Sequence, residues 1–117
     1  MARVVALLPD LLFGSKVQGM LVAAGHDVTA VGSPEAVLDH VGACDLVVAD
    51  LCEDATRRIE LLAPATAAER SLAFYLHTDV ETRTSALAAG FDLVVPRSRM
   101  AREGASLVDG LLPGAQA

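Results

Sequence analysis

Two aspartates that follow apolar segments are the residues best placed to do chemistry in this chain. Asp50 comes near the end of the segment 45–51 (DLVVADL), and Asp10 lies just beyond the apolar run Val4–Leu8. If the two segments are neighbouring parallel strands, both carboxylates lie at the carboxyl edge of the sheet, where open α/β sheets build their sites. Two carboxylates in one crevice can hold a magnesium ion, which prefers oxygen ligands, and one of them can accept a phosphoryl group.

Five apolar strands alternate with helical patterns and provide the frame for these residues. We assign the strands to residues 4–8, 26–31, 45–49, 72–76 and 92–95. Apolar residues at helical spacing predict the helices, as in the stripes Phe13, Val17, Met20, Leu21 and Ala24, and Leu107, Val108, Leu111 and Leu112. Because the strands are continuous apolar runs, they predict a parallel sheet covered on both faces. By analogy we expect the flavodoxin-like (βα)5 doubly wound fold, an α/β fold with strand order 2-1-3-4-5.

Capping residues and a proline mark where three of the helices begin or end. Ser33 has the residue type and position of an N-cap for a short second helix. Pro64 is expected to end the third helix, residues 53–62. Thr78 and Glu81 have capping-box spacing, which predicts that Thr78 caps the fourth helix.

The composition limits the classes of function. The chain has 117 residues, a formal net charge of −6 and 3% aromatic residues. The acidity argues against binding the phosphate backbone of nucleic acids, and the scarcity of aromatic side chains argues against a flavin or nucleotide pocket. The first apolar run is too short for a signal peptide or a membrane span. We therefore expect residues 1–117 to form one cytoplasmic domain, with a frayed tail at 113–117, no effector module, and no membrane or nucleic-acid partner.

Two stretches resemble the receiver domain of response regulators. The segment 45–51 is similar to the family's third strand, with Asp50 at the phosphoryl-accepting position. Residues 86–92 (ALAAGFD) are similar to the helix end that leads into the family's fifth strand. The resemblance covers nearly the whole chain. It implies phosphoryl transfer from a histidine kinase to Asp50, with a magnesium ion bound by two adjacent acids at the end of the first strand.

Several positions depart from that pattern. A gapless match places Leu8 and Pro9 where the two acids are expected, with Asp10 one residue late, and Arg97 at the family's lysine. The Ser or Thr at the end of the fourth strand has three candidates, depending on a gap: Leu76, His77 and Thr78. Phosphoryl transfer depends mainly on positioning and on neutralising charge with the metal ion and nearby cations. We therefore interpret the chain as a divergent, pseudo-receiver domain with weak or absent phosphorylation and at most weak magnesium binding. Its predicted pocket consists of Asp50, Asp10, Thr78 and Arg97.

Both aspartates also have plain structural explanations. Asp50 can accept hydrogen bonds from backbone amides ahead of the next helix, a role that we weigh evenly against a degenerate pocket. On that account an Asp50→Asn variant loses no more than about 1 kcal/mol of stability. Asp10 follows the first strand at the position of a helix N-cap, and we favour this role over a metal-binding one.

Three arginines form a basic cluster between the fifth strand and the closing helix. Arg97, Arg99 and Arg102 are expected to be paired there with Glu103 and Asp109. All five residues are assigned to the face formed by the fourth helix, the fifth strand and the fifth helix, where receiver domains commonly contact a partner or a second copy. We therefore predict a protein partner or self-association on this face, with the mixed charges arranged about a two-fold axis.

Two other functions are considered beside this interpretation. The first is a phospho-accepting single-domain response regulator, which the same resemblance implies. The second is a small flavodoxin-like enzyme or ligand-binding domain, but residues 9–12 (PDLL) lack the Ser, Thr and Gly of a flavin phosphate loop. The glycine-rich dinucleotide and P-loop patterns are also absent from the sequence. We therefore expect no enzymatic activity and no cofactor, and we expect Cys44 and Cys52 to be free thiols.

Overall fold

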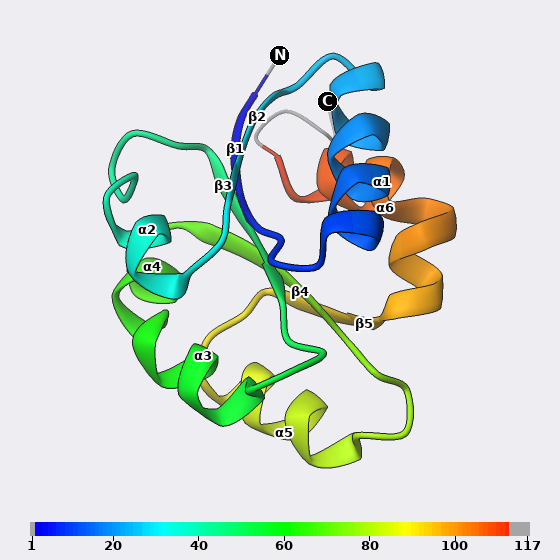
Figure 1. Cartoon of the computed structure of the whole chain (residues 1–117). Coiled ribbons are helices and arrows are strands. Elements are labelled where there is room, and N and C mark those ends of the chain that lie inside the picture. Colours follow the sequence, from blue (N-terminus) through cyan, green and yellow to red (C-terminus); the bar gives the residue numbers. More distant parts are fainter. Residues whose placement is uncertain (1, 113–117) are drawn as a thin grey trace.

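A computed structural model describes residues 2–112, which form a parallel five-stranded sheet with helices on both faces (Figure 1). The strand order is β2-β1-β3-β4-β5, which confirms the predicted flavodoxin-like arrangement. The strands are β1 (Arg3–Leu7), β2 (Asp27–Val31), β3 (Leu46–Asp50), β4 (Arg70–Tyr75) and β5 (Leu93–Pro96). The helices are α1 (Leu11–Ala23), α2 (Pro34–Leu38), α3 (Ala55–Leu61), α4 (Ala63–Ala68), α5 (Val80–Ala88) and α6 (Arg97–Leu111). None of the helices in residues 2–112 is long and apolar enough to cross a membrane.

The sheet separates two apolar cores, because successive residues of a strand point to opposite faces. One core lies under α2, α3, α4 and α5 and includes Leu7 and Ala49. The other lies under α1 and α6, which pack side by side on the opposite face, and it includes Ala6 and Val48. Burial on both faces explains why the strands are continuous apolar runs and not alternating ones.

Two helix starts differ from the prediction. α3 ends at Leu61, close to its predicted end, but Pro64 lies in the first turn of α4, a separate short helix that was not predicted, where a missing N–H leaves no hydrogen bond unmade. Asp79 and not Thr78 caps α5, since the Asp79 carboxylate accepts a hydrogen bond from the amide of Thr82 at 3.2 Å. Aspartate is at least as good an N-cap as threonine, and the sequence does not separate two adjacent capping residues.

The closing helix starts earlier than its apolar stripe indicated. α6 begins at Arg97, directly after Pro96 ends β5, and carries all three arginines of the expected cluster in its first two turns. The cluster is therefore helical, and the prediction of a connecting segment was wrong. Met100 and Gly104 are buried in the first half of α6, but charged residues surround them, so no stripe of leucines and valines marks this part of the helix. The expected frayed tail lies outside the described residues.

The register of the sheet brings the ends of β1 and β3 together. Leu7 is paired with Ala49, so Asp50 and the segment 8–10 lie at the same edge of the sheet. Asp10 caps α1, with its Oδ1 accepting hydrogen bonds from the amides of Leu12 and Phe13 at 3.0 Å each. The predicted N-cap role of Asp10 is confirmed. Both aspartates are therefore fixed beside the same edge, as expected for a site in an open parallel sheet.

Candidate functional site

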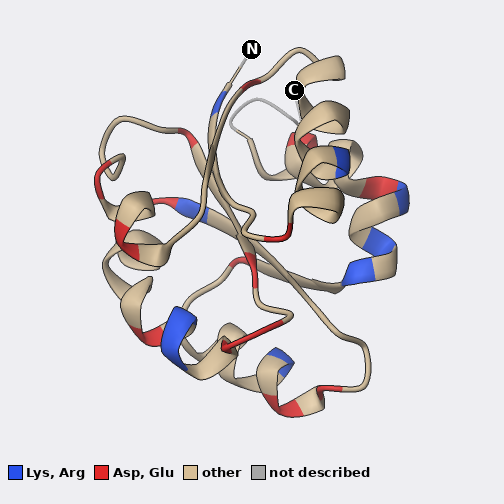
Figure 2. Ribbon diagram, viewed as in Figure 1, with Lys and Arg blue, Asp and Glu red and all other residues tan. Residues whose placement is uncertain are grey.

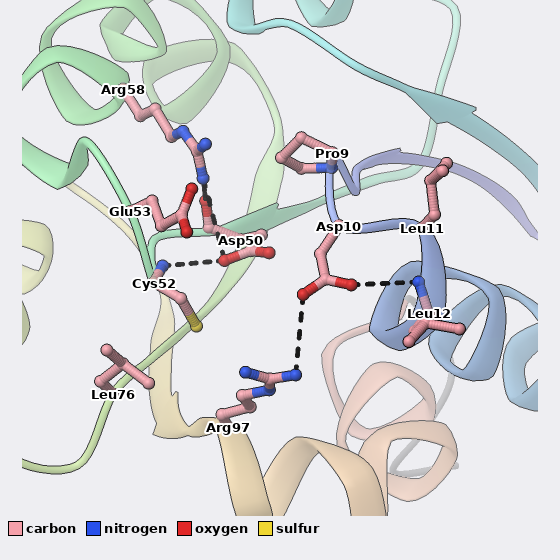
Figure 3. Close-up of a pocket in the computed structure, with 10 residues that line it drawn as sticks. All are labelled: Pro9, Asp10, Leu11, Leu12, Asp50, Cys52, Glu53, Arg58, Leu76 and Arg97. Carbon is pink, nitrogen blue, oxygen red and sulfur yellow. Dashed lines mark hydrogen bonds and ion pairs between the residues drawn. The ribbon is translucent and has the colours of Figure 1, made fainter.

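A cavity of about 450 Å³ opens at the carboxyl edge of β1 and β3 (Figure 3). Its lining residues are Pro9, Asp10, Leu11, Leu12, Asp50, Cys52, Glu53, Arg58, Leu76 and Arg97. The structure thus brings together Asp50, Asp10 and Arg97, three of the four predicted pocket residues. Thr78 does not line this cavity; it is exposed in the loop before α5, and Leu76 lies at the cavity wall instead. The end of β4 therefore offers the pocket an apolar side chain and no hydroxyl.

The carboxylate of Asp50 lies at the floor of this cavity, and its side chain is only 6% exposed. Its Oδ1 accepts a hydrogen bond of 2.8 Å from the amide of Cys52, which is the backbone role expected from the sequence. Its Oδ2 receives no hydrogen bond from the described residues 2–112, and Figure 3 shows it pointing toward the Asp10 side of the pocket. One oxygen is held in place, and the other faces the cavity.

Arg58 completes the surroundings of Asp50, and the sequence reasoning missed it. Its Nη1 donates a hydrogen bond of 2.8 Å to the main-chain carbonyl oxygen of Asp50 and lies 3.8 Å from Oδ1. Both side chains are largely buried, so water screens this pair only weakly. Asp54 adopts a left-handed conformation (φ 51°) and turns the chain from β3 into α3, which lets Arg58 reach back. A separation of eight residues has no fixed geometric meaning, so the only sequence signal was an arginine on the next helix.

A second guanidinium group, that of Arg97, lies close to the carboxylate of Asp10. The Nη2 of Arg97 is 3.8 Å from Oδ2 of Asp10, and the Arg97 guanidinium carbon stands 4.2 Å above the centre of the Phe13 ring. That ring packs in turn on Phe74 of β4, with their centroids 5.3 Å apart. The planar Arg97 side chain is therefore held by stacking as well as by charge, which the point charge of a lysine does not reproduce.

These contacts do not fit the magnesium ion that the receiver resemblance implies. Magnesium is bound through carboxylate and water oxygens in near-octahedral geometry. The two positions of the expected acids hold Leu8 and Pro9, and both Asp10 and Asp50 already face a guanidinium. Within residues 2–112 no three His, Cys, Asp or Glu side chains are grouped so that they could hold a metal ion. The donor set of the pocket thus differs from that of a magnesium site.

Cys52 lines the pocket beside Asp50, and its surroundings favour the protonated thiol. Cys44 and Cys52 are both free and half-buried, as the sequence predicted. Burial, followed by the negative charge of Asp50, raises the pKa of Cys52 from 9.0 to about 12, although Arg97 and Arg58 act in the opposite direction. Since the thiolate is the nucleophilic form, this raised pKa makes Cys52 a poor nucleophile.

The charged residues expected on the interaction face are all in α6 (Figure 2). Arg99 lies 3.3 Å from Glu103, which confirms one expected pair, and Arg102 is exposed beside it. Asp109 does not pair with the arginines, because its carboxylate lies 2.7 Å from Nε2 of His26. Asp109 lies ten positions after Arg99 in the helix, a distance of about 15 Å along the axis. The expectation that Asp109 balances the arginine cluster was wrong.

Comparison with known proteins identifies the fold. No protein-family model and no curated protein matches the sequence. Among solved structures, a CheY-like receiver domain protein from Methanospirillum hungatei matches with a TM-score of 0.82 and 16% identity, over 99% of this chain and 97% of that chain. NtrX from Brucella abortus, solved with ADP, matches with a TM-score of 0.81 and 17% identity, over 98% of this chain and 27% of that chain.

A third match is an atypical orphan response regulator, described as having a phosphorylation-independent regulatory mechanism. Its TM-score is 0.76 and its identity 16%, over 96% of both chains. This chain spans nearly the full length of two of the three proteins but only about a quarter of NtrX. High structural similarity at such low identity reflects a shared fold, and the chain therefore has the fold of a response-regulator receiver domain.

Proposed function

We propose that this chain is a receiver-like signalling domain that acts through protein contacts, with weak or no phosphorylation of Asp50 and no enzymatic activity. The observation that carries the proposal is that each aspartate of the pocket faces a guanidinium of its own chain, Asp50 facing Arg58 and Asp10 facing Arg97. Phosphoryl transfer depends on cations that are free to bind the incoming phosphoryl oxygens. Here the cations are already neutralised by the carboxylates. The pocket is therefore poorly suited to the reaction.

Intact mass after incubation with acetyl phosphate and magnesium tests this proposal. We expect no stoichiometric addition of a phosphoryl group. The matched control is Asp50→Ala, which removes the only carboxylate at the acceptor position and should, like the unsubstituted protein treated alike, gain no phosphoryl mass. A full gain of one phosphoryl group that Asp50→Ala abolishes would contradict the proposal.

One observation favours a second candidate function, that of a phospho-accepting response regulator. Oδ2 of Asp50 faces the cavity and receives no hydrogen bond from residues 2–112, so one carboxylate oxygen is available to attack phosphorus. Against it stand Leu76, where a hydroxyl would contact the phosphoryl group, and the engaged Asp10. The mass experiment separates the two functions directly.

The partner surface that we propose is the edge formed by α5, β5 and α6. β5 is an edge strand of the sheet, and α5 and α6 flank it on the two faces. Leu87 of α5 is partly exposed there, while Arg99, Arg102 and Glu103 project from α6. An apolar side chain bordered by both signs of charge can match its own copy about a two-fold axis, with Arg99 of one copy near Glu103 of the other. We therefore propose self-association as the first contact to test.

Sedimentation at low and at high salt tests self-association. Rim charges contribute mainly to specificity and are screened by salt, so the associated fraction should fall as salt rises. Arg99→Glu should lower association at low salt by placing like charges opposite each other. Arg57→Glu is the control, because Arg57 is exposed on α3, which covers the opposite face of the sheet from α6. A protein that stays monomeric at high concentration in low salt would exclude self-association and leave a different protein as the partner.

The proposed mode of action has a structural counterpart. One of the solved structures that share this fold is described as an atypical orphan response regulator with a phosphorylation-independent regulatory mechanism. We propose the same general mode for this chain, in which the state of the domain is set by its binding partner and not by a phosphoryl group. A histidine kinase, which the receiver resemblance implies, is then not required for the output of this domain.

A further inference from the structure

The pocket contains its own cation at the acceptor aspartate. Arg58 Nη1 contacts both ends of Asp50, at 2.8 Å from its carbonyl oxygen and 3.8 Å from its Oδ1. Figure 3 shows the guanidinium of Arg58 directed at Asp50 from α3, while Asp10 and Arg97 lie on the other side of the pocket. Arg58 is therefore not a surface side chain that happens to reach the pocket, because its contact with the main chain fixes the guanidinium at the end of β3.

The charges of the pocket explain why such a cation is needed. Three carboxylates line the cavity, those of Asp10, Asp50 and Glu53, against two guanidinium groups. Asp50 is the most buried of the three, and a buried carboxylate without a partner is strongly unfavourable. In a site that binds a divalent cation, the metal supplies this neutralisation. Here Arg58 supplies it permanently.

The loop between β3 and α3 is folded so that Arg58 stays in place. Asp54 is the only non-glycine residue with positive φ in the described part of the chain, at φ 51°. Ile59 of α3 and Leu62 at its end are packed in the apolar core beneath α2, α3, α4 and α5, which holds the helix against the sheet. The direction of α3 is thus set by contacts other than those of Arg58. Arg58 is presented to Asp50 by a helix that is already anchored.

We infer that Arg58 occupies the role of the divalent cation at Asp50, so that this receiver fold is neutralised by its own side chain and excludes magnesium from the pocket. The inference rests on the proposed function and deepens it, since it names the residue that makes the pocket independent of metal. Removing the Arg58 charge leaves three carboxylates facing a single guanidinium. Such a pocket attracts a divalent cation, which can bind to one or two carboxylates with water completing its shell.

Metal titrations of four proteins test the inference: the unsubstituted chain, Arg58→Gln, Arg57→Gln and the double variant Arg58→Gln/Asp50→Asn. Binding of Mn²⁺ is measured by water proton relaxation, and the thermal midpoint is measured with MgCl₂ against NaCl at equal ionic strength. Arg58→Gln should bind Mn²⁺ at least about tenfold more tightly than the unsubstituted chain. Magnesium should raise its thermal midpoint. Arg57→Gln, which removes an exposed arginine from the same helix, should bind no more tightly than the unsubstituted chain, and the double variant should lose the gain.

Two results would overturn the inference. One is tight Mn²⁺ binding by the unsubstituted chain, and the other is a folded Arg58→Gln variant that binds no better than it. If Arg58→Gln is unfolded without metal, a cation that binds only the folded state must promote refolding. Failure of about 20 mM MgCl₂ to restore its circular dichroism then also counts against the inference. The proposed function is contradicted by a different result, a gain of one phosphoryl group by the unsubstituted chain. The metal binding of Arg58→Gln does not affect that test.

Discussion

His26 and Asp109 are joined by a contact of 2.7 Å between Nε2 and Oδ1, across 83 residues of the sequence. Nδ1 of the same ring accepts a hydrogen bond of 3.4 Å from the amide of Ala2, which assigns the ring proton to Nε2. The imidazole is almost fully buried, while the carboxylate is exposed. This contact links the starts of β1 and β2 to the last turns of α6, at the edge of the sheet opposite the pocket.

Asp109→Ala should lower the free energy of unfolding by about 1–2 kcal/mol, because it leaves the buried Nε2–H of His26 without its acceptor. Urea unfolding followed by circular dichroism measures the change. Glu103→Ala is the matched control on the same helix, since it breaks only the exposed pair with Arg99 and should cost no more than about 0.5 kcal/mol. Equal losses in the two variants would mean that the contact with His26 contributes little and that both changes act only through the helix.

Asp50→Asn should destabilise the protein by about 2–3 kcal/mol, because the substitution leaves the largely buried Arg58 without its counter-charge. This exceeds the limit of about 1 kcal/mol that a purely capping role would set. Urea unfolding of Asp50→Asn, Arg58→Gln and the double variant completes the comparison. The double variant should be at least about 1 kcal/mol more stable than the sum of the single losses predicts, since removing both charges avoids an unpaired one. Strictly additive losses would show that the pair is not coupled.

The fold was predictable because it depends on features that are local in sequence. Five continuous apolar runs, each followed by a helical stripe, predict a two-sided parallel sheet whatever the individual side chains are. The positions of Asp10 and Asp50 followed from the same pattern, because the ends of parallel strands meet at one edge. The remaining errors concern helix boundaries: α4 was not expected as a separate helix, α6 begins earlier than its apolar stripe, and Asp79 caps α5 in place of Thr78. Propensity does not resolve two adjacent caps.

The charge arrangement of the pocket was only partly predictable. Arg97 could be placed near Asp10 because its position followed from the strand end and the family resemblance. Arg58 could not, because its contact with Asp50 depends on one left-handed residue, Asp54, and on the direction in which α3 leaves the loop. Sequence spacing carries information inside a helix or strand, where geometry is regular, and loses it across an irregular turn. The decisive cation of the pocket lies across such a turn.

Asp10→Ala should cost about 1 kcal/mol, and Asp10→Ser should cost only a few tenths, because serine keeps an acceptor for the amides of Leu12 and Phe13. Thermal or urea unfolding of the two variants measures the difference. Both substitutions remove the charge that faces Arg97. The loss of this exposed ion pair therefore lowers the stability of both variants equally and cancels when the two are compared. Equal losses for alanine and serine would mean that the charge of Asp10, and not its capping role, stabilises the start of α1.

The two thiols give a pH dependence with a definite sign. The pKa of Cys52 is raised from 9.0 to about 12 by burial and then by Asp50, and burial followed by Glu69 raises the pKa of Cys44 to about 12. A group whose pKa is higher in the folded state than in the unfolded state makes its full contribution to stability at pH values below its pKa in the unfolded chain. That contribution is lost as the pH rises toward the folded pKa. The thermal midpoint should therefore fall between about pH 9 and pH 12, and replacing both cysteines by alanine should reduce the slope.

The rate of alkylation by iodoacetamide at pH 9 separates the two causes of the raised pKa at each thiol, which are burial and nearby negative charge. In urea both cysteines should react quickly, whereas in the folded protein the raised pKa keeps each thiol protonated, so both should react far more slowly. Asp50→Asn should accelerate the alkylation of Cys52, because it removes the negative charge that disfavours the thiolate. The alkylation rate of Cys44 should not change, because the charges that raise its pKa are those of Glu69 and Asp45. Peptide mapping by mass spectrometry gives the two rates in one sample. Parallel acceleration of both cysteines would indicate general unfolding, and no acceleration of Cys52 would mean that burial alone raises its pKa.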